Sequence, residues 1–168
     1  MTYTACSFTG HRKIEDRHKE RIGGLLFRAI RYAYGLGCRD FFCGGALGFD
    51  TAAAKEVIRF RMSHPDCRLG LLLPCRDQSS AWREDEIRLY EYILSEADTV
   101  LYASDEYTEG CMRERNRRLA EAADVVIAYV GRERSGAGQT VRIAKSLGRE
   151  VYNLYLALDK EEKQVSEN

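Results

Sequence analysis

The chain has 168 residues, of which 45% are hydrophobic and 31% charged, and its 26 Lys and Arg residues balance 26 Asp and Glu residues. This size and composition predict one globular domain with a single core. The balanced charge gives no overall field that attracts nucleic acid, so it counts against nucleic acid as a partner. The sequence shows no apolar run of membrane-spanning length and no signal peptide. We therefore expect a cytoplasmic protein without a membrane partner.

The hydrophobic pattern predicts strands that alternate with helices along the chain. The expected strands cover residues 4–9, 40–43, 68–73, 99–102, 125–129 and 151–154. The expected helices cover an amphipathic stretch from Ile22 to Ala33, a stretch that ends near His64, residues 81–96 and 111–123, and a stretch that ends at Gly148. We assign residues 1–158 to one domain and expect residues 159–168 to form a charged, frayed tail.

Strict alternation of strands and helices is typical of a three-layer α/β domain with a mainly parallel central sheet. The run 68–73 shows no polar–apolar alternation, as expected for a strand buried on both faces. Ligands of such sheets bind at the carboxyl ends of the strands, where the strand order reverses. Three glycine-containing turns follow predicted strands, and we expect all three to border one crevice.

The turn after residue 43 is the first candidate binding element. Gly44, Gly45, Ala46 and Gly48 lie between a strand and an alanine-rich helix. This arrangement leaves backbone N–H groups free to bind an anion. Asp50 can cap the helix or hold a ribose hydroxyl. The alternative is a tight turn that binds no ligand.

Two further turns carry groups suited to phosphate. Gly10, His11 and Arg12 follow the first strand, and there Arg can clamp a phosphate while His donates a hydrogen bond to it. A solvated loop is the alternative. The last turn offers hydroxyl and amide groups from Ser135, Gly136, Ala137, Gly138 and Thr140. It is neither a Walker A loop nor a G-x-G-x-x-G loop, which argues against a conventional kinase or dinucleotide dehydrogenase.

Two helical features have both a functional and a structural interpretation. Arg115 and Asn116 can reach the crevice, whereas the neighbouring arginines are expected to pair with glutamates on a solvated face. Trp82 can stack on a base or pack on the core. Residues 84–86 are expected to be an exposed helix start. His18 and His64 are expected on the surface.

The cysteines show no spacing typical of zinc, so no metal site is predicted. They are Cys6, Cys38, Cys43, Cys67, Cys75 and Cys111. Most lie in or beside apolar runs, which indicates buried free thiols in a reducing compartment.

In their order along the chain, these motifs resemble the SLOG superfamily, and most closely its YpsA-like branch of bacterial proteins. The resemblance rests on residues 9–12, 44–50, 82, 97–98, 107, 115–116, 124 and 135–140. The middle turn is also similar to the Ser-Gly-x-Ala-x-Gly-x-Asp motif of DprA, with Gly44 at the Ser position. The last turn is similar to the Pro-Gly-Gly-x-Gly-Thr motif of LOG enzymes. The resemblance implies a Rossmann-like fold and a site for a nucleotide-derived ligand such as NAD or ADP-ribose.

Three functions follow as hypotheses. The first is a cytoplasmic sensor or regulatory protein that binds an NAD-like molecule or a nucleoside phosphate, with phosphates on the turns at 44–48 and 135–140 and with Arg12 and Arg115 as clamps. The second is an enzyme that cleaves an N-glycosidic or phosphoester bond. The third is a DprA-like binder of single-stranded DNA. We expect no LOG-type release of a base, because Arg142 and Ile143 stand where that motif has Glu. The oligomeric state stays open, a homo-oligomer included.

Overall fold

The computed structural model describes residues 2–168. The strands are β1 (Ala5–Gly10), β2 (Asp40–Cys43), β3 (Arg68–Cys75), β4 (Thr99–Ser104), β5 (Val125–Tyr129) and β6 (Glu150–Asn153). The helices are α1 (Lys19–Gly35), α2 (Phe49–Arg61), α3 (Glu84–Glu96), α4 (Cys111–Ala122), α5 (Gly136–Ser146) and α6 (Leu154–Glu167), with a short 3-10 helix, η1 (Asp16–His18), before α1.

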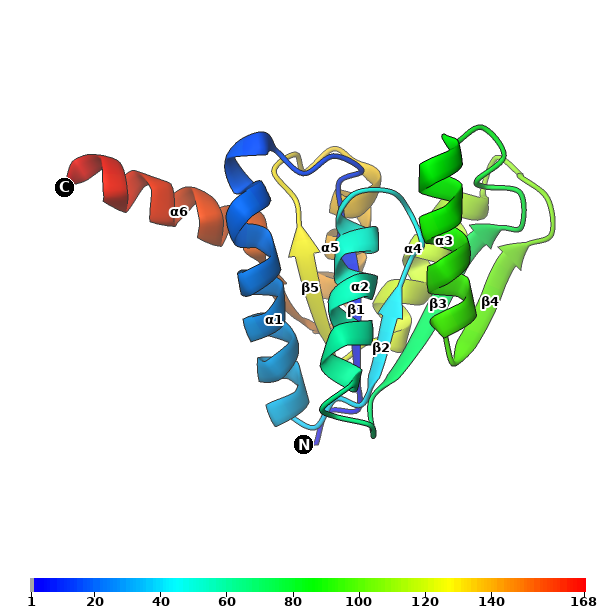
Figure 1. Ribbon diagram of the computed structural model, residues 1–168, viewed down its shortest axis with the longest axis horizontal. Coiled ribbons are helices and arrows are strands. Elements are labelled where there is room, and N and C mark those ends of the chain that lie inside the picture. The colour runs from blue at the N-terminus through cyan, green and yellow to red at the C-terminus, as the bar shows by residue number, and fades with distance from the viewer. Residues whose placement is uncertain (1) are drawn as a thin grey trace.

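The six strands form one parallel sheet in the order β4-β3-β2-β1-β5-β6. Helices α1, α2 and α3 cover one face of this sheet, and α4 and α5 cover the other (Figure 1). The α/β prediction is thus confirmed, with the Rossmann-like three-layer architecture. The strand order reverses at β1, because the chain adds strands on the β2 side first and on the β5 side later.

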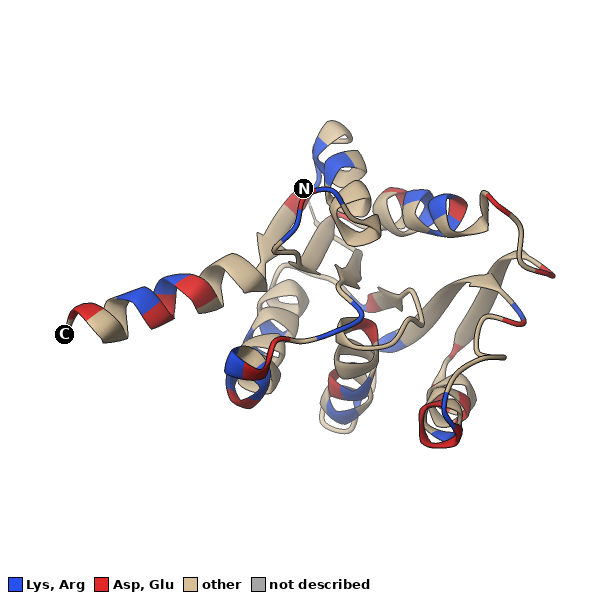
Figure 2. Ribbon diagram, turned by 90° about the horizontal axis from the view of Figure 1, so that it is seen from above, with Lys and Arg blue, Asp and Glu red and all other residues tan. Residues whose placement is uncertain are grey.

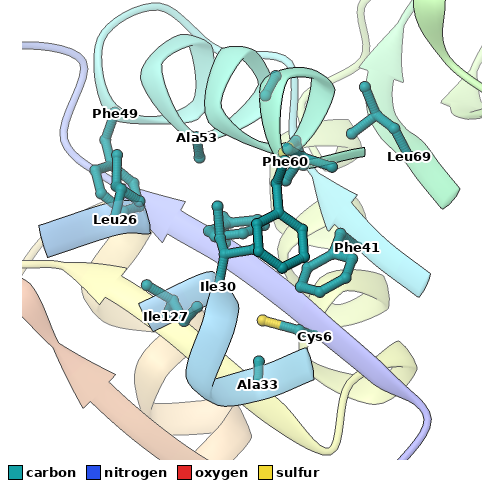
Figure 3. Close-up of a cluster of buried hydrophobic side chains, with 14 of the residues drawn as sticks. Cys6, Leu26, Ile30, Ala33, Phe41, Phe49, Ala53, Phe60, Leu69 and Ile127 are labelled. Carbon is teal, nitrogen blue, oxygen red and sulfur yellow. The ribbon is translucent and has the colours of Figure 1, made fainter. Parts of the chain in front are cut away.

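The core lies between the sheet and the helices of the first face. Leu26 and Ile30 of α1 meet Phe41 of β2 and Ile127 of β5 there, and all four side chains are fully buried (Figure 3). Residues 69–75 of β3 are buried throughout, so the apolar run marks a strand covered on both faces, as predicted. Full burial of one such side chain stabilises the fold by about 1.5–3 kcal/mol.

The end of the chain differs from its prediction. Asn153 caps α6, since its side chain accepts a hydrogen bond from the Tyr155 amide, and the last strand therefore stops one residue earlier than expected. Residues 159–167 continue α6 and do not fray into a tail. Leu154 and Leu158 anchor the helix in the core, so the charge of its last residues did not correctly predict their structure.

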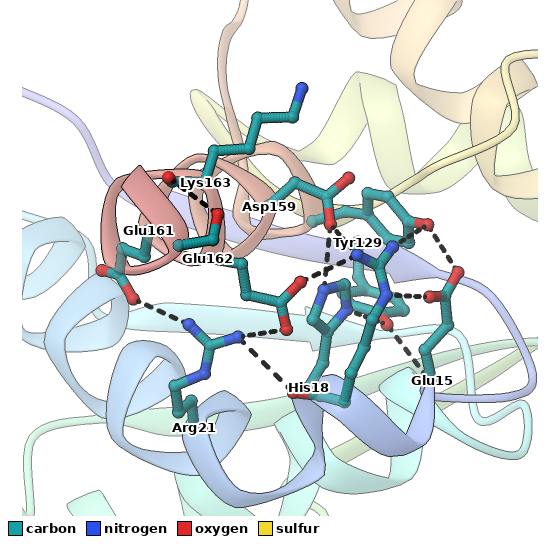
Figure 4. Close-up of polar contacts among 11 residues, drawn as sticks. Glu15, His18, Arg21, Tyr129, Asp159, Glu161, Glu162 and Lys163 are labelled. Carbon is teal, nitrogen blue, oxygen red and sulfur yellow. Dashed lines mark hydrogen bonds and ion pairs between the residues drawn. The ribbon is translucent and has the colours of Figure 1, made fainter. Parts of the chain in front are cut away.

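Ion pairs fasten α6 to η1 and the start of α1. Arg17 lies 2.8 Å from Asp159 and 2.9 Å from Glu162, and Arg21 lies 2.9 Å from Glu162 (Figure 4). The sequence gives no local signal of these contacts, because the partners lie more than a hundred residues apart.

The prediction that His18 is a surface residue is wrong. Its side chain is fully buried, with Nδ1 at 2.7 Å from the Tyr129 hydroxyl and Nε2 at 3.2 Å from Asp159 (Figure 4). The Tyr129 hydroxyl also accepts a hydrogen bond from the Glu15 amide. A buried histidine needs such partners, and here they come from β5 and α6.

The six cysteines are buried and free, as predicted. Burial raises the pKa of the Cys6 and Cys43 thiols well above the ordinary value, so these thiols stay protonated and unreactive. Among residues 2–168, no helix combines the length and apolarity needed to cross a bilayer.

Candidate functional site

A cavity of about 300 Å³ lies at the carboxyl end of β1, where the strand order reverses. Figure 2 views the molecule from above, onto this edge of the sheet. The cavity lies between α2 on one face and α4 and α5 on the other, and it is lined by Thr9, Gly10, His11, Arg12, Ala46, Asp50, Met112, Arg115, Asn116, Leu119, Arg132, Ser135, Gly136 and Ala137. All three turns predicted to share a crevice contribute to it.

The turn after β1 is fixed by contacts on both sides. A Cβ at Gly10 would collide with the ring of Phe49, so only glycine fits there. His11 Nε2 accepts hydrogen bonds from the amides of Gly131 and Arg132, at 2.9 and 3.3 Å. Because Nε2 is an acceptor, His11 is neutral and carries its proton on Nδ1. Burial and the nearby Arg132 also lower the pKa of His11.

The glycine turn after β2 packs against the protein itself. Gly45 and Gly48 have φ values of 70° and 79°, which favour glycine. A Cβ at Gly45 would collide with Leu73, and one at Gly48 with the Arg12 carbonyl. These two glycines are therefore required by chain geometry, and neither lines the cavity.

Asp50 stands in the first turn of α2, with only 5% of its surface exposed. Oδ2 accepts a hydrogen bond from the Ala46 amide at 3.3 Å, whereas Oδ1 has no hydrogen-bond partner within the described residues. Burial raises the pKa of Asp50 to about 6, although Arg115, the Ala46 amide and Arg12 favour the ionised form. The carboxyl group is therefore mostly ionised at neutral pH, at a cost in stability.

Arg115 and Asn116 of α4 tie the glycine turn to α5. Arg115 Nη1 donates to the Gly44 carbonyl, and Nε donates to Asn116 Oδ1 at 2.9 Å. Asn116 Nδ2 donates to the Gly136 carbonyl at 3.2 Å. A Cβ at Gly44 would lie 2.8 Å from both Arg115 Nη1 and Asp50 Oδ2, so any larger residue there would displace both charged groups.

The amino end of α5 faces the same cavity. Ser135 caps the helix by accepting the Gly138 amide at 3.0 Å, and its hydroxyl donates to the Arg132 carbonyl at 2.7 Å. Within residues 2–168, the amides of Gly136 and Ala137 have no hydrogen-bond partner. Such free amides at a helix amino end are suited to an anion.

The structure gathers most, but not all, of the predicted site residues. Six of them do not line the cavity, namely Gly44, Gly45, Gly48, Trp82, Gly138 and Thr140. Trp82 packs edge-on against Tyr90, with ring centroids 5.2 Å apart, and so takes the structural role of its two interpretations. A Cβ at Gly138 would collide with the Glu133 carbonyl, so this glycine also serves the turn.

Four lining residues were missed by the sequence analysis: Thr9, Met112, Leu119 and Arg132. Met112 and Leu119 stand three residues before Arg115 and three after Asn116, and this helical spacing could have indicated the shared face of α4. Arg132 lies in an irregular loop, and its place at the cavity depends on the long-range bond from its amide to His11. That contact has no signature in the local sequence.

A second cavity, of about 450 Å³, adjoins the first and shares His11, Arg12 and Arg132 with it. Glu15 and Tyr155 are among its other lining residues. The shared residues thus lie at the junction of two spaces, with a net positive charge from the two arginines.

The family model YpsA, described as the YspA SLOG family, matches residues 7–157. The chain belongs to the YpsA SLOG family. A UPF0398 protein of Bacillus thuringiensis (strain Al Hakam) is 32% identical over 122 residues, which cover 68% of this YpsA-family chain and 64% of that relative. A UPF0398 protein of Bacillus cereus (strain G9842) is 31% identical over 131 residues, which cover 73% of this chain and 69% of the relative. The match to the first relative thus spans less than two thirds of its length.

Solved structures of two DNA processing proteins share the fold of the YpsA-family chain. DprA of Streptococcus pneumoniae superposes with a TM-score of 0.65 at 20% identity, over 90% of this chain and 50% of that one. DNA processing protein A of Helicobacter pylori, which binds single-stranded DNA, gives a TM-score of 0.64 at 20% identity, over 89% and 64% of the two chains. At this identity the likeness shows the fold alone.

Proposed function

We propose that this chain binds a nucleoside phosphate, or a larger nucleotide-derived molecule such as NAD or ADP-ribose, in the crevice at β1. In this proposal it acts as a cytoplasmic sensor or regulatory protein. One observation carries the proposal: a single cavity is lined by a helix amino end, by three arginines and by Asp50, a buried carboxylate with one oxygen that lacks a partner among residues 2–168. These are the two kinds of group that a phosphate and a sugar hydroxyl require.

The phosphate is assigned to the α5 side of the cavity. The amides of Gly136 and Ala137, which have no hydrogen-bond partner among residues 2–168, lie there, and Arg12 and Arg132 line the same space. The amino end of α2 is less suited, because the carboxylate of Asp50 already occupies it and would repel a second anion. This assignment differs from the sequence-based hypothesis, which placed phosphates on both turns.

Arg115 has a smaller part in the proposal than the sequence suggested. Two of its nitrogens already donate to Gly44 and Asn116, and its side chain is largely buried. It therefore holds the glycine turn in place, and its third nitrogen, Nη2, donates to Met112 Sδ at 3.8 Å. Met112 and Leu119 add an apolar wall on which a base can lie.

The second cavity gives room for a larger ligand. Its junction with the first carries Arg12, Arg132 and the His11 imidazole, which suit a pyrophosphate. Each cavity falls near the lower part of the range of about 300–1,000 Å³ that is usual for small-molecule sites. A mononucleotide suits the first cavity alone, and a molecule with two nucleotide halves suits both.

The direct test is thermal-shift screening of the purified chain against AMP, ADP-ribose, NAD and cyclic nucleotides, followed by calorimetry. A ligand at 100 times its dissociation constant is expected to stabilise the protein by about 2.7 kcal/mol. Arg132→Ala should weaken binding roughly tenfold or more, since a hydrogen bond to a charged group contributes about 1.5–3 kcal/mol. Arg134→Ala removes the same charge from the same exposed loop but does not line the cavity, and it should bind as the unaltered chain does.

If no nucleotide stabilises the protein, or if both arginine variants bind alike, the site is wrongly assigned. Single-stranded DNA is the second candidate ligand, favoured by the fold shared with DprA. A gel-shift titration across salt concentrations distinguishes it, because contacts to several phosphates make the affinity fall steeply with salt. Tight, strongly salt-dependent binding of an oligonucleotide, with no response to mononucleotides, would replace the proposal by a DNA-binding function.

A further inference from the structure

Asp50 is the buried carboxyl group of the proposed site, and its unpartnered oxygen sets a requirement on the ligand. It is 95% removed from solvent, which is costly for a carboxylate without partners. Of its two oxygens, only Oδ2 has a hydrogen bond, to the Ala46 amide. The structure therefore retains a buried acceptor that no group of residues 2–168 satisfies.

The position of Asp50 indicates what can satisfy it. The residue lines the same cavity as the α5 amino end, so a ligand bound through its phosphate at α5 passes close to the carboxyl group. Oδ1 itself is shielded from solvent, so a ligand in this space reaches it only when the carboxyl group turns about its side-chain torsion, which is broad. The missing partner must be a donor, since an ionised carboxylate only accepts hydrogen bonds.

We propose that Asp50 accepts a hydrogen bond from the ribose diol and so selects ribonucleotides over deoxyribonucleotides. The inference rests on the proposed function and refines its ligand class. A ribose offers two vicinal hydroxyl donors near its phosphate, whereas a 2′-deoxyribose offers one. A neighbouring phosphate is excluded from this position by charge, and an apolar group would leave the carboxylate without a donor.

The environment of Asp50 also keeps it fit for this role at neutral pH. Asp50 Oδ2 and Arg115 Nη1 each lie 2.8 Å from the point where a Cβ of residue 44 would stand. The positive charge of Arg115 favours the ionised form of the Asp50 carboxyl group. Arg115 is itself held by Gly44 and Asn116, so the carboxylate has a fixed positive neighbour without forming its own hydrogen bond to it. An accepting oxygen thus remains free for the ligand.

The experiment compares AMP, 2′-deoxy-AMP and 3′-deoxy-AMP by calorimetry at pH 7.5 in the unaltered chain. 2′-Deoxy-AMP should bind about tenfold or more weakly than AMP, because it leaves a charged acceptor unsatisfied, and 3′-deoxy-AMP reports on the other hydroxyl of the diol. In Asp50→Asn the difference should fall to less than about threefold, since the bonding partner is then a neutral amide. Circular dichroism of the variant checks that it is folded.

A matched control is Asp85→Asn. Asp85 is also the second residue of its helix, α3, but it is exposed and paired with Arg83. This variant should keep the full preference for AMP. Equal binding of AMP and 2′-deoxy-AMP by the unaltered chain would overturn the inference and leave the proposed function standing, even if Asp50→Asn failed to fold. Absence of binding by any of them would overturn both.

Discussion

The crevice at β1 and the contact between α6 and η1 are both rich in charged groups, but they differ in how those groups are satisfied. At the α6 contact, Arg17, His18 and Arg21 all have carboxylate partners on α6. In the crevice, Asp50 Oδ1 and the amides of Gly136 and Ala137 have no hydrogen-bond partner in the part of the chain that the structure describes. A fully paired cluster stabilises the fold, whereas a buried group left unpaired costs stability and is explained by a ligand. The comparison predicts that substitutions at the α6 contact lower the free energy of unfolding, and that substitution of Asp50 in the crevice raises it.

The largest effect is expected at the α6 contact. His18→Ala should lower the free energy of unfolding by about 3–4 kcal/mol, because it leaves a cavity and removes partners from Tyr129 and Asp159. Urea unfolding measures the change. The neighbouring Lys19→Ala breaks only an exposed pair with Asp16 and should stay within about 0.5 kcal/mol of the unaltered chain. A loss at His18 no larger than that at Lys19 would show that the contact is not structural.

In the absence of ligand, Asp50→Asn is expected to raise the free energy of unfolding. The pKa of Asp50 in the folded chain is about 6 and its ordinary value is 3.8. At pH values between these two, the folded chain therefore keeps a proton on Asp50 that the unfolded chain has lost. The stability contribution of Asp50 is therefore full below about pH 4 and lost as pH rises through 6. Near pH 7, Asp50→Asn should raise the free energy of unfolding by up to about 3 kcal/mol.

Thermal unfolding between pH 4.5 and 7.5 measures this prediction. The difference between Asp50→Asn and the unaltered chain should grow with pH across that window. Asp85→Asn, whose carboxylate is exposed, should show no such growth. A destabilised Asp50→Asn at pH 7.5 would mean that the buried carboxylate already has a stabilising partner in the protein, which removes the contrast between the two regions.

A small effect is expected for Glu162→Gln. Glu162 pairs with both Arg17 and Arg21, but all three side chains are at least a third exposed. Such pairs contribute about 1 kcal/mol or less, and salt screens them. Urea unfolding at low and at high salt should show a difference that shrinks as salt is added. A loss as large as that of His18→Ala would mean that α6 is held by its surface charges and not by its buried contacts.

No effect is expected in the assay for LOG-type catalysis. Asp50 is the sole carboxylate among the residues that line the first cavity, and Arg142, which stands where the LOG motif has Glu, is exposed and donates to the Glu133 carbonyl. Incubation of the chain with AMP should therefore release no free base by chromatography. Release in proportion to protein, lost in Asp50→Asn, would show that the cavity performs glycosidic cleavage and does not only bind.

The fold was predictable because its signals are local. Each apolar run marks a strand, and the fully apolar run in β3 indicates burial on both faces. Much of the candidate site followed from topology, since turns after parallel strands meet at one edge. Asp50, Arg115 and the start of α5 were found in this way.

The remainder depends on contacts between distant parts of the chain. The burial of His18 is set by Tyr129 and Asp159, which lie 111 and 141 residues away along the chain. The lining role of Arg132 depends in the same way on His11. The glycine turn was misread for a related reason: a sequence shows that Gly45 and Gly48 can approach another group closely, but not that the group is the protein's own Leu73 or Arg12.

The docking of α6 has a consequence for folding on the ribosome. The partners of Arg17 on α6 are separated from it by as many as 145 residues, so that length of chain must be synthesised before the pairs can form. At about 5–20 residues per second, Arg17 therefore waits about 7–29 s for its partners on α6. His11 at the crevice waits nearly as long, because the Gly131 and Arg132 amides that bond to its side chain lie 120 and 121 residues further along the chain.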